Sequence, residues 1–245
     1  MFTIDSIGRT ARISLDRPQS RNAISLHHWA ALSAAFAEVA ASDARVLIVR
    51  SMAPNIFSSG ADIGDLGTLD ADPAARTRFR AEMAAAFDQL AALPIATIAA
   101  IDGGCYGAAV ALALACDIRV AGDKASFAIT PAKVGIVYPK GDVARLKALV
   151  GPGQAARMLL SGMTLDADQA LAIGLVEERA RSADTAAFKL AESIIANSRA
   201  SVAGLKRILA GDDEADRMFE DAFASADFRE GVAAFRERRK PVFER

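Results

Sequence analysis

The chain has 245 residues, of which 29 are Lys or Arg and 30 are Asp or Glu. This length suits one large domain, or a core of about 180–200 residues with a smaller appendage. The balanced charge gives no overall field that would attract nucleic acid or an anionic membrane, and no apolar run reaches the roughly 18 residues of a membrane span. The opening residues also have no cationic, apolar leader. We therefore expect a cytoplasmic globular protein with no nucleic-acid and no membrane partner.

The first half of the chain alternates short strands with helices. FTIDSI and ARISLD alternate apolar and polar residues around a Gly-Arg turn, which predicts a hairpin at a sheet edge. Ser25 is expected to cap a helix through LHHWAALSAAFAEVAA, and residues 46–50 (VLIVR) form a short buried strand. An alanine-rich helix then runs from about Asp72 to Ala91. It leads to the apolar strand at 95–101, IATIAAI. This order predicts parallel strands joined by right-handed crossovers.

In the second half, CDIRVAG and ASFAIT are expected strands, and nearly everything from Asp142 onward has a helical pattern. Asp142 is expected to be the N-cap of the helix VARLKALVG. The tail DFREGVAAFRERRKPVFER predicts a basic amphipathic helix that ends before Pro241. Cys105 and Cys116 have neither CxxC spacing nor a histidine neighbour, so we expect two buried thiols, no disulfide and no metal site.

Two glycine-bearing turns follow neighbouring strands of this pattern. FSSGADI comes after residues 46–50, and GGCYGAAV comes after residues 95–101. The carboxyl ends of parallel strands meet at one sheet edge, where ligands of such folds bind. In each turn a glycine lets the following backbone N–H, that of Ala61 or Ala108, point outward. Two converging donors would form an oxyanion hole for an enolate or a tetrahedral oxyanion, each contributing roughly 3–4 kcal/mol in a dry site.

Four motifs in this order carry a resemblance to a known family. FSSGADI, GGCYGAAVALALACDIRVA, ASFAITPAKVG and GVAAFRERRKPVF resemble the crotonase, or enoyl-CoA hydratase/isomerase, superfamily from about Leu15 to Phe243. The resemblance implies an α/β fold, with a crotonase spiral core of repeated ββα turns and an acyl-CoA pocket in residues 1–190. It also implies a helical C-terminal trimerisation region in residues 191–245.

The same resemblance implies thioester chemistry through a stabilised enolate. Ala61 and Ala108 would then be the catalytic N–H donors, in agreement with the reasoning from the two turns. The implied protein is a lyase or isomerase of fatty acid metabolism, assembled as a homotrimer or a dimer of trimers. Coenzyme A, as the thioester carrier of the substrate, is the one cofactor-like group expected.

Two residues depart from the pattern of family hydratases. Where these enzymes have glutamates, this chain has Ala111, four residues after Gly107 of the second turn, and Ala132 after Pro131. Hydration of an enoyl thioester requires a water that a carboxylate deprotonates and a proton delivered to carbon. Three functions therefore stay open: an enoyl-CoA hydratase/isomerase-type enzyme with another acid or base, a decarboxylase of a malonyl-type CoA thioester, and a non-catalytic acyl-CoA binder.

Tyr138 is the third catalytic candidate. The pattern TP followed by GxxY resembles the methylmalonyl-CoA decarboxylase branch of the superfamily, in which a tyrosine in this register contacts the acyl carboxylate. That branch has a histidine where this chain has Ala61, so the resemblance is partial. A neutral phenol suits holding a carboxylate better than removing a proton. The alternative role for Tyr138 is a hydroxyl that caps a loop at the pocket rim.

Asp62 is expected to be an N-cap or a ligand-side contact rather than a base, and His27 and His28 are expected to be structural residues far from both turns.

The resemblance also assigns contacts with coenzyme A. The assigned positions are Arg21, Ala23 and Ile24 at the adenine end, Asp62 and Ile63 along the pantetheine arm, and Phe235 and Arg238 of the tail at the nucleotide, often that of a neighbouring subunit.

Overall fold

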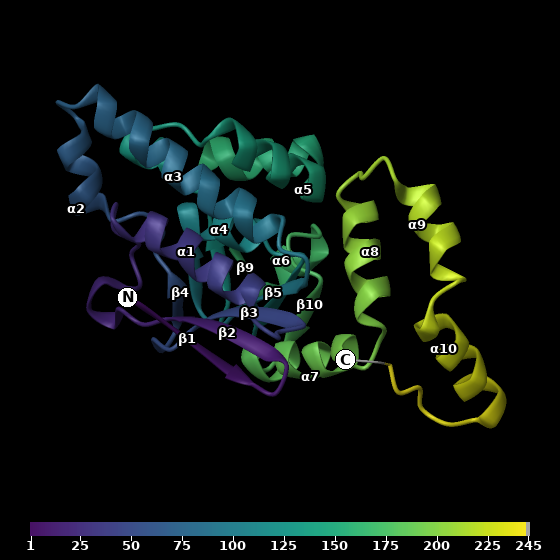
Figure 1. Ribbon diagram of the computed structural model, residues 1–245. Coiled ribbons are helices and arrows are strands. Elements are labelled where there is room, and N and C mark those ends of the chain that lie inside the picture. The colour runs from purple at the N-terminus through teal and green to yellow at the C-terminus, as the bar shows by residue number, and fades with distance from the viewer. Residues whose placement is uncertain (244–245) are drawn as a thin grey trace.

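The computed structural model describes residues 1–243 of the chain (Figure 1). The strands are Phe2–Ile7 (β1), Thr10–Leu15 (β2), Val46–Ser51 (β3), Ile56–Ser58 (β4), Ala96–Ile101 (β5), Gly104–Tyr106 (β6), Ile118–Gly122 (β7), Ser126–Ala128 (β8), Thr164–Asp166 (β9) and Glu178–Ala180 (β10). The helices are His28–Ala41 (α1), Ile63–Leu66 (α2), Pro73–Ala91 (α3), Ala108–Leu114 (α4), Lys140–Ser161 (α5), Ala167–Ala172 (α6), Ala183–Ile195 (α7), Arg199–Leu209 (α8), Ala215–Ala222 (α9) and Ala226–Glu237 (α10).

The strands form two sheets. The six-stranded sheet has the order β1-β2-β3-β5-β7-β10, and the four-stranded sheet has the order β4-β6-β8-β9. In the larger sheet β1 and β2 form the expected antiparallel hairpin, and the remaining pairs are parallel. Strand β3 is buried on both faces: Leu47 and Val49 belong to one apolar core, and Val46 and Ile48 to the other. This explains why its sequence is continuously apolar.

The chain alternates between the two sheets in a regular way. One strand enters the six-stranded sheet, the next enters the four-stranded sheet, and a helix follows, as in β3-β4-α3, β5-β6-α4 and β7-β8-α5. Helix α7 covers the face of the larger sheet formed by Val46 and Ile48, on the opposite side from α3 and α5 in Figure 1. This arrangement is the spiral of ββα turns that the resemblance implied.

Helices α8, α9 and α10 form a C-terminal arm, residues 199–237, that lies beside the sheets (Figure 1). Lys206 of α8 holds the arm to the core, because its ammonium donates to the Ile95 carbonyl at 2.9 Å and to Asp117 at 2.8 Å. The arm falls within the expected helical region 191–245, of which residues 244–245 lie outside the described residues.

Two helix caps expected from the sequence are wrong. Helix α1 begins at His28, three residues after Ser25, and the Ser25 hydroxyl instead contacts the ring nitrogens of His27 and His28. Helix α5 begins at Lys140 because Pro139, with φ −60° and ψ 145°, precedes it in an extended conformation. Asp142 therefore lies inside the first turn of α5, where its side chain is buried.

Four short strands escaped the sequence analysis because three residues are too few to show an alternating pattern. Strands β4 and β6 have the largest consequence: the two glycine-bearing turns follow them, in the four-stranded sheet, rather than β3 and β5. Strands β9 and β10 interrupt the region that was expected to be helical. The two turns still lie at one edge of a sheet, as expected, because β4 and β6 are parallel neighbours.

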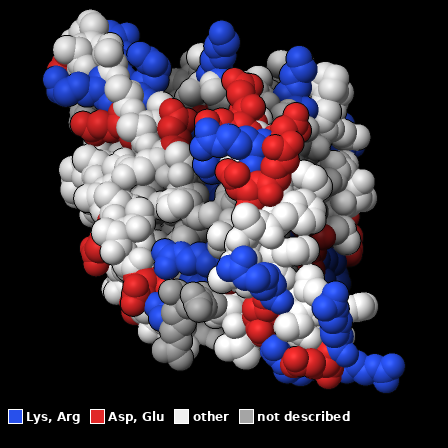
Figure 2. All heavy atoms as spheres, turned by 45° about the vertical axis from the view of Figure 1, so that its right-hand side comes forward, with Lys and Arg blue, Asp and Glu red and all other residues white. Residues whose placement is uncertain are grey.

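The surface carries charges of both signs. Figure 2 shows acidic and basic side chains interspersed on one face, with uncharged surface between them. This pattern agrees with the formal net charge of −1. Within residues 1–243, no helix combines the length and the apolar character that a membrane crossing requires.

Candidate active site

The two glycine-bearing turns touch each other. Gly60 has φ +91° and Gly107 has φ +54°, a backbone region that residues other than glycine rarely adopt. A Cβ atom on Gly60 would lie 2.5 Å from the Tyr106 carbonyl oxygen and 2.8 Å from the Ala108 nitrogen. The absence of a side chain at Gly60 is therefore what allows the backbone of the first turn to reach that of the second.

The backbone N–H groups after these glycines are not used by the fold. Ile24 pairs with the first turn by donating to the Gly60 carbonyl at 2.7 Å and accepting from the Asp62 N–H at 3.0 Å. In such a parallel bridge the N–H of Ala61, between them, points away from Ile24. Ala108 is the first residue of α4, where an N–H has no helical partner. In residues 1–243, neither N–H donates a hydrogen bond. Both are therefore free to donate to a bound ligand.

The helix behind the second turn is an apolar support. All residues of α4 after Ala108 are buried, and Ala111 is fully so. Cys105 and Cys116 are free, buried thiols, as expected. Burial raises the pKa of both, that of Cys116 to about 12, so they stay protonated and are poor nucleophiles.

Tyr138 lies against the second turn. It precedes α5, is half-buried against the larger apolar core, and donates a hydrogen bond of 3.0 Å from its hydroxyl to the Gly107 carbonyl. Burial raises the pKa of this phenol well above its ordinary value, and the Asp142 carboxylate raises it further. The hydroxyl therefore remains protonated and can keep donating. The sequence pattern identifies Tyr138 as a candidate site residue, but it does not predict the hydrogen bond to Gly107.

Asp142 is a buried carboxylate that the sequence analysis treated as a helix cap. Its side chain is 4% exposed, and Arg145 approaches it only at 3.4 Å while also binding Asp88 of α3. Burial, with a smaller contribution from Asp88, raises the pKa of Asp142 to about 6 against the opposing effect of Arg145. The one signal in the sequence was the Asp-x-x-Arg spacing, which is common on exposed helix faces as well.

The pKa of Asp142 predicts how stability depends on pH. Because the folded-state pKa, about 6, exceeds the ordinary aspartate value of 3.8, the folded state holds this proton more tightly than the unfolded state. The charged carboxylate therefore destabilises the fold increasingly as the pH rises from about 4 to 6, and the cost persists above that range. Asp142→Asn removes it.

We expect the melting temperature of Asp142→Asn, relative to the unsubstituted protein, to be higher at pH 7 than at pH 4 by at least about 2 °C. Scanning calorimetry at the two pH values measures the difference. Asp88→Asn, at a 70% exposed carboxylate, serves as the control and should show a much smaller change. Melting temperatures of Asp142→Asn that follow those of the unsubstituted protein at both pH values would contradict the prediction.

Several residues expected to contact the adenine end or the pantetheine arm of coenzyme A lie beside the first turn. Ala23 and Ile24 are buried, and Ile24 is bridged to Ala61. Asp62 caps α2 by accepting from the Gly64 N–H at 3.0 Å, and its hydrogen bond with Arg17 at 2.8 Å is the main reason that its pKa is lowered. The Asp62 cap agrees with the expectation from the sequence.

The exposed residues expected to contact coenzyme A lie in two separate regions of the chain. Ile63 is 68% exposed at the start of α2, and the Arg21 guanidinium lies 5.9 Å from the centre of the Tyr106 ring. Phe235, which is 85% exposed, and Arg238, which ends α10, belong to the C-terminal arm. Figure 1 shows α10 on the other side of the molecule from α2. One chain therefore does not bring these two residues to the first turn.

The histidines lie closer to the first turn than their place in the sequence indicated. Ser25, which contacts both rings, directly follows Ile24 of the bridge to Ala61, and the Leu26 N–H donates to Asp65 of α2 at 2.9 Å. Burial, followed by the His27 charge, lowers the pKa of His28, which favours its neutral form. This link to the first turn runs through residues 24–26, and no local sequence pattern predicts it.

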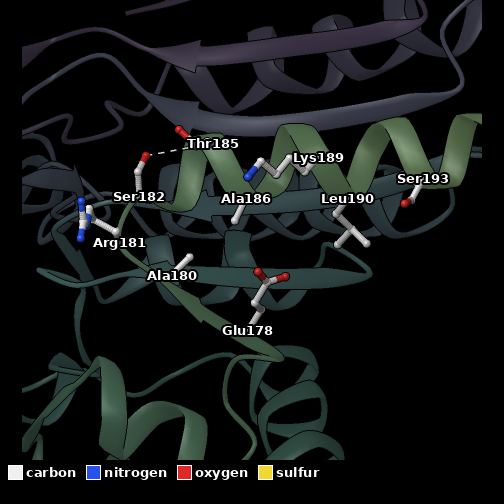
Figure 3. Close-up of a pocket in the computed structure, with 9 residues that line it drawn as sticks. All are labelled: Glu178, Ala180, Arg181, Ser182, Thr185, Ala186, Lys189, Leu190 and Ser193. Carbon is white, nitrogen blue, oxygen red and sulfur yellow. Dashed lines mark hydrogen bonds between the residues drawn. The ribbon is translucent and has the colours of Figure 1, made fainter.

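A groove of about 490 Å³ lies elsewhere, between β10 and α7 (Figure 3). Arg181, Ser182 and Lys189 lie along it, and the Ser182 hydroxyl caps α7 by accepting from the Thr185 N–H. The Asp102 carboxylate accepts hydrogen bonds from the first two N–H groups of α7, those of Ala183 and Asp184. None of the site residues expected from the sequence lines this groove. It is therefore separate from the candidate active site.

The fold and the site together define a class of protein: an α/β spiral in which two touching turns each carry a backbone N–H with no partner in residues 1–243. The family described as Enoyl-CoA hydratase/isomerase matches residues 7–245. The chain belongs to this family, the crotonase superfamily, and is an enzyme of the hydratase/isomerase type.

Individual relatives agree with this assignment. "Probable enoyl-CoA hydratase 2, mitochondrial" of Arabidopsis thaliana is 32% identical, over 94% of this chain and 80% of the relative. "Probable enoyl-CoA hydratase echA8" of Mycobacterium leprae is 30% identical, over 98% of this chain and 96% of the relative. A solved enoyl-CoA hydratase/isomerase family protein from Hyphomonas neptunium has a TM-score of 0.95 and 36% identity, with 99% of this chain and 97% of that chain covered.

Proposed function

We propose that the chain binds an acyl-CoA thioester and stabilises its enolate with the N–H groups of Ala61 and Ala108. The observation that carries the proposal is the contact between the two turns at Gly60, which places two unpaired donors on adjoining backbone. Donors fixed in advance stabilise a charge that develops during the reaction without reorganising. An enolate oxygen forms when a proton, or a carboxylate as CO₂, leaves the carbon next to the thioester carbonyl.

Coenzyme A would lie along the first turn. Arg21 with the backbone of Ala23 and Ile24 would contact the adenine end, and Asp62 and Ile63 would follow the pantetheine arm. The support for this placement is that these residues adjoin Ala61 in the structure. Apart from coenzyme A itself, the proposal uses no cofactor. A cytoplasmic location remains the expectation, although one relative is described as mitochondrial.

The proposed reaction type rests on two glutamates of family hydratases that this chain lacks. Ala111 and Ala132 occupy the positions where family hydratases have glutamates, so we assign lyase or isomerase chemistry through an enolate rather than hydration in particular. The test is product analysis by mass spectrometry with enoyl-, 3-hydroxyacyl- and malonyl-type CoA thioesters. Turnover of enoyl or hydroxyacyl thioesters supports a hydratase/isomerase, and loss of CO₂ from malonyl thioesters alone supports a decarboxylase. Tight binding with no turnover of any thioester would contradict the enzymatic proposal and favour the acyl-CoA binder.

The C-terminal region, residues 191–245, would join copies of the chain into a trimer or a dimer of trimers. Phe219, Phe223 and Phe228 support this, since they are 65%, 52% and 43% exposed and lie in edge-to-face contact along the arm. A patch of this kind is typical of a protein interface. Assembly through this region would also let Phe235 and Arg238 reach the nucleotide bound to a neighbouring chain.

Analytical ultracentrifugation tests the assembly. We expect a mass of three or six chains for the unsubstituted protein and a smaller assembly for the double variant Phe219→Ser, Phe223→Ser. Ile7→Ser, at a 49% exposed position in the hairpin, is the control and should keep the full mass. A monomeric unsubstituted protein at micromolar concentration would contradict the proposal.

A further inference from the structure

The Tyr138 hydroxyl contacts the same peptide unit that carries one of the two proposed oxyanion donors. The carbonyl of Gly107 and the N–H of Ala108 belong to one trans peptide group, so they point in opposite directions. Tyr138 donates to that carbonyl at 3.0 Å. The phenol therefore lies behind the N–H, on the side away from the oxygen that the N–H would bind.

This peptide group needs external support because a glycine precedes it. Gly107 has φ 54° and ψ −124°, and the torsion ψ sets the direction of the Gly107–Ala108 peptide. Gly107 is anchored on its other side, where its N–H donates to the Ala128 carbonyl at 2.9 Å. Its own carbonyl accepts from the Val110 N–H at 3.0 Å, within the same turn, and from Tyr138. The Tyr138 hydroxyl thus gives this carbonyl a hydrogen bond from outside the turn.

The hydrogen bond has an electronic consequence as well. A donor on a peptide carbonyl polarises the amide and strengthens the N–H as a donor, and this effect is larger where water is excluded. Burial, followed by the Asp142 carboxylate, keeps the pKa of the phenol high, so the donor is not lost at ordinary pH. A phenol has a single proton. While that proton is donated to Gly107, it cannot be donated to a substrate carboxylate.

We propose that Tyr138 is a positioning residue whose hydroxyl orients and polarises the Gly107–Ala108 peptide, so that the Ala108 N–H meets the enolate oxygen. This role rests on the proposed function of the two turns. It replaces the role in which Tyr138 holds the carboxylate of a malonyl-type substrate. The titratable groups near the phenol are the Asp142 carboxylate of α5 and the Cys105 thiol of β6. Arg145 contacts Asp142 and also binds Asp88 of α3, while the side chains of α4 are all apolar.

Acetoacetyl-CoA tests the role without depending on turnover, because it ionises to an enolate with its own ultraviolet absorption. A hole that stabilises the enolate lowers the apparent pKa of the bound ligand. We expect Tyr138→Phe to raise that pKa by about one unit, a tenfold loss of enolate, with the dissociation constant of a saturated acyl-CoA unchanged. For accepted substrates, kcat should fall about tenfold while KM changes little, since the hydrogen bond acts mainly on the transition state.

The other tyrosine supplies a matched control. Tyr106 bonds Ser126 at 2.8 Å rather than the Gly107 carbonyl, so Tyr106→Phe should leave the pKa of bound acetoacetyl-CoA unchanged. Since the chain has 2 tyrosines, growing the Tyr106→Phe protein with 3-fluorotyrosine labels Tyr138 alone. The fluorinated phenol is the stronger donor and should lower the enolate pKa. This arm keeps the test decisive if Tyr138→Phe does not fold.

The outcomes separate this inference from the proposed function. If the unsubstituted protein stabilises the enolate but Tyr138→Phe and the fluorinated protein match it, the positioning role is wrong and the oxyanion hole stands. Weaker binding of every thioester with an unchanged enolate pKa, or a loss confined to malonyl-type substrates, would also overturn the role, because Tyr138 would then contact the ligand. If the unsubstituted protein does not stabilise the enolate at all, the proposed function itself fails.

Discussion

Ala108→Pro is expected to lower kcat/KM for every accepted acyl-CoA by about 10²–10³-fold while leaving the fold intact. Proline has no N–H, so the substitution deletes the proposed donor and puts a ring methylene in the place of its hydrogen. The first position of a helix tolerates proline well, and Ala108 is the first residue of α4. Gly107, with ψ −124°, is also outside the helical region that a following proline disfavours.

Steady-state kinetics with the thioester panel measures the loss, and circular dichroism with thermal unfolding checks the fold. Ala108→Ser is the matched control, because it changes the same side chain, keeps the N–H, and should keep most of the activity. Full activity in a folded Ala108→Pro protein would show that the N–H of Ala108 has no part in the reaction.

Gly60→Ala is expected to damage both the fold and the site. The new Cβ atom would lie 2.5 Å from the Tyr106 carbonyl oxygen and 2.8 Å from the Ala108 nitrogen, and both are backbone atoms that cannot rotate away. The residue would also be held at φ +91°. Strain of this kind costs on the order of 1–3 kcal/mol, and relief by backbone movement would separate the two turns. We therefore expect a lower unfolding free energy together with a loss of activity.

Denaturant unfolding and kinetics on the same preparation test this prediction. Gly67→Ala is the control on the same segment, because Gly67 has a helical backbone with φ −59° and open space at the Cβ position. Its substitution should be neutral or stabilise the protein by about 0.4–1 kcal/mol. A Gly60→Ala protein with the stability and activity of Gly67→Ala would mean that the close approach of the two turns is not required.

The sequence predicted the parts of this protein that depend on local or repeated signals. The hairpin, the buried strand β3, helix α3 and the parallel pairing of β3 with β5 follow from alternating or helical patterns several residues long. The turns at Gly60 and Gly107 were found because a glycine after an apolar strand signals a special backbone conformation. The ordered motifs added the spiral, which no periodicity could have shown.

The remaining features depend on contacts between distant residues. Strands β4 and β6 exist through their pairing with each other, since three residues have little preference of their own. The hydrogen bond from Tyr138 to Gly107 joins residues 31 positions apart, and the burial of Asp142 likewise depends on how α5 packs in the fold. An aspartate near the start of a helix is usually an exposed cap, so local statistics favoured the wrong position for Asp142.

A crystal structure of the protein with acetoacetyl-CoA tests the central claim most directly. The account predicts that the thioester oxygen lies about 2.7–3.1 Å from the backbone nitrogens of both Ala61 and Ala108, with coenzyme A running along the first turn. A thioester oxygen that contacts neither nitrogen, or a ligand seated in the groove between β10 and α7, would contradict it.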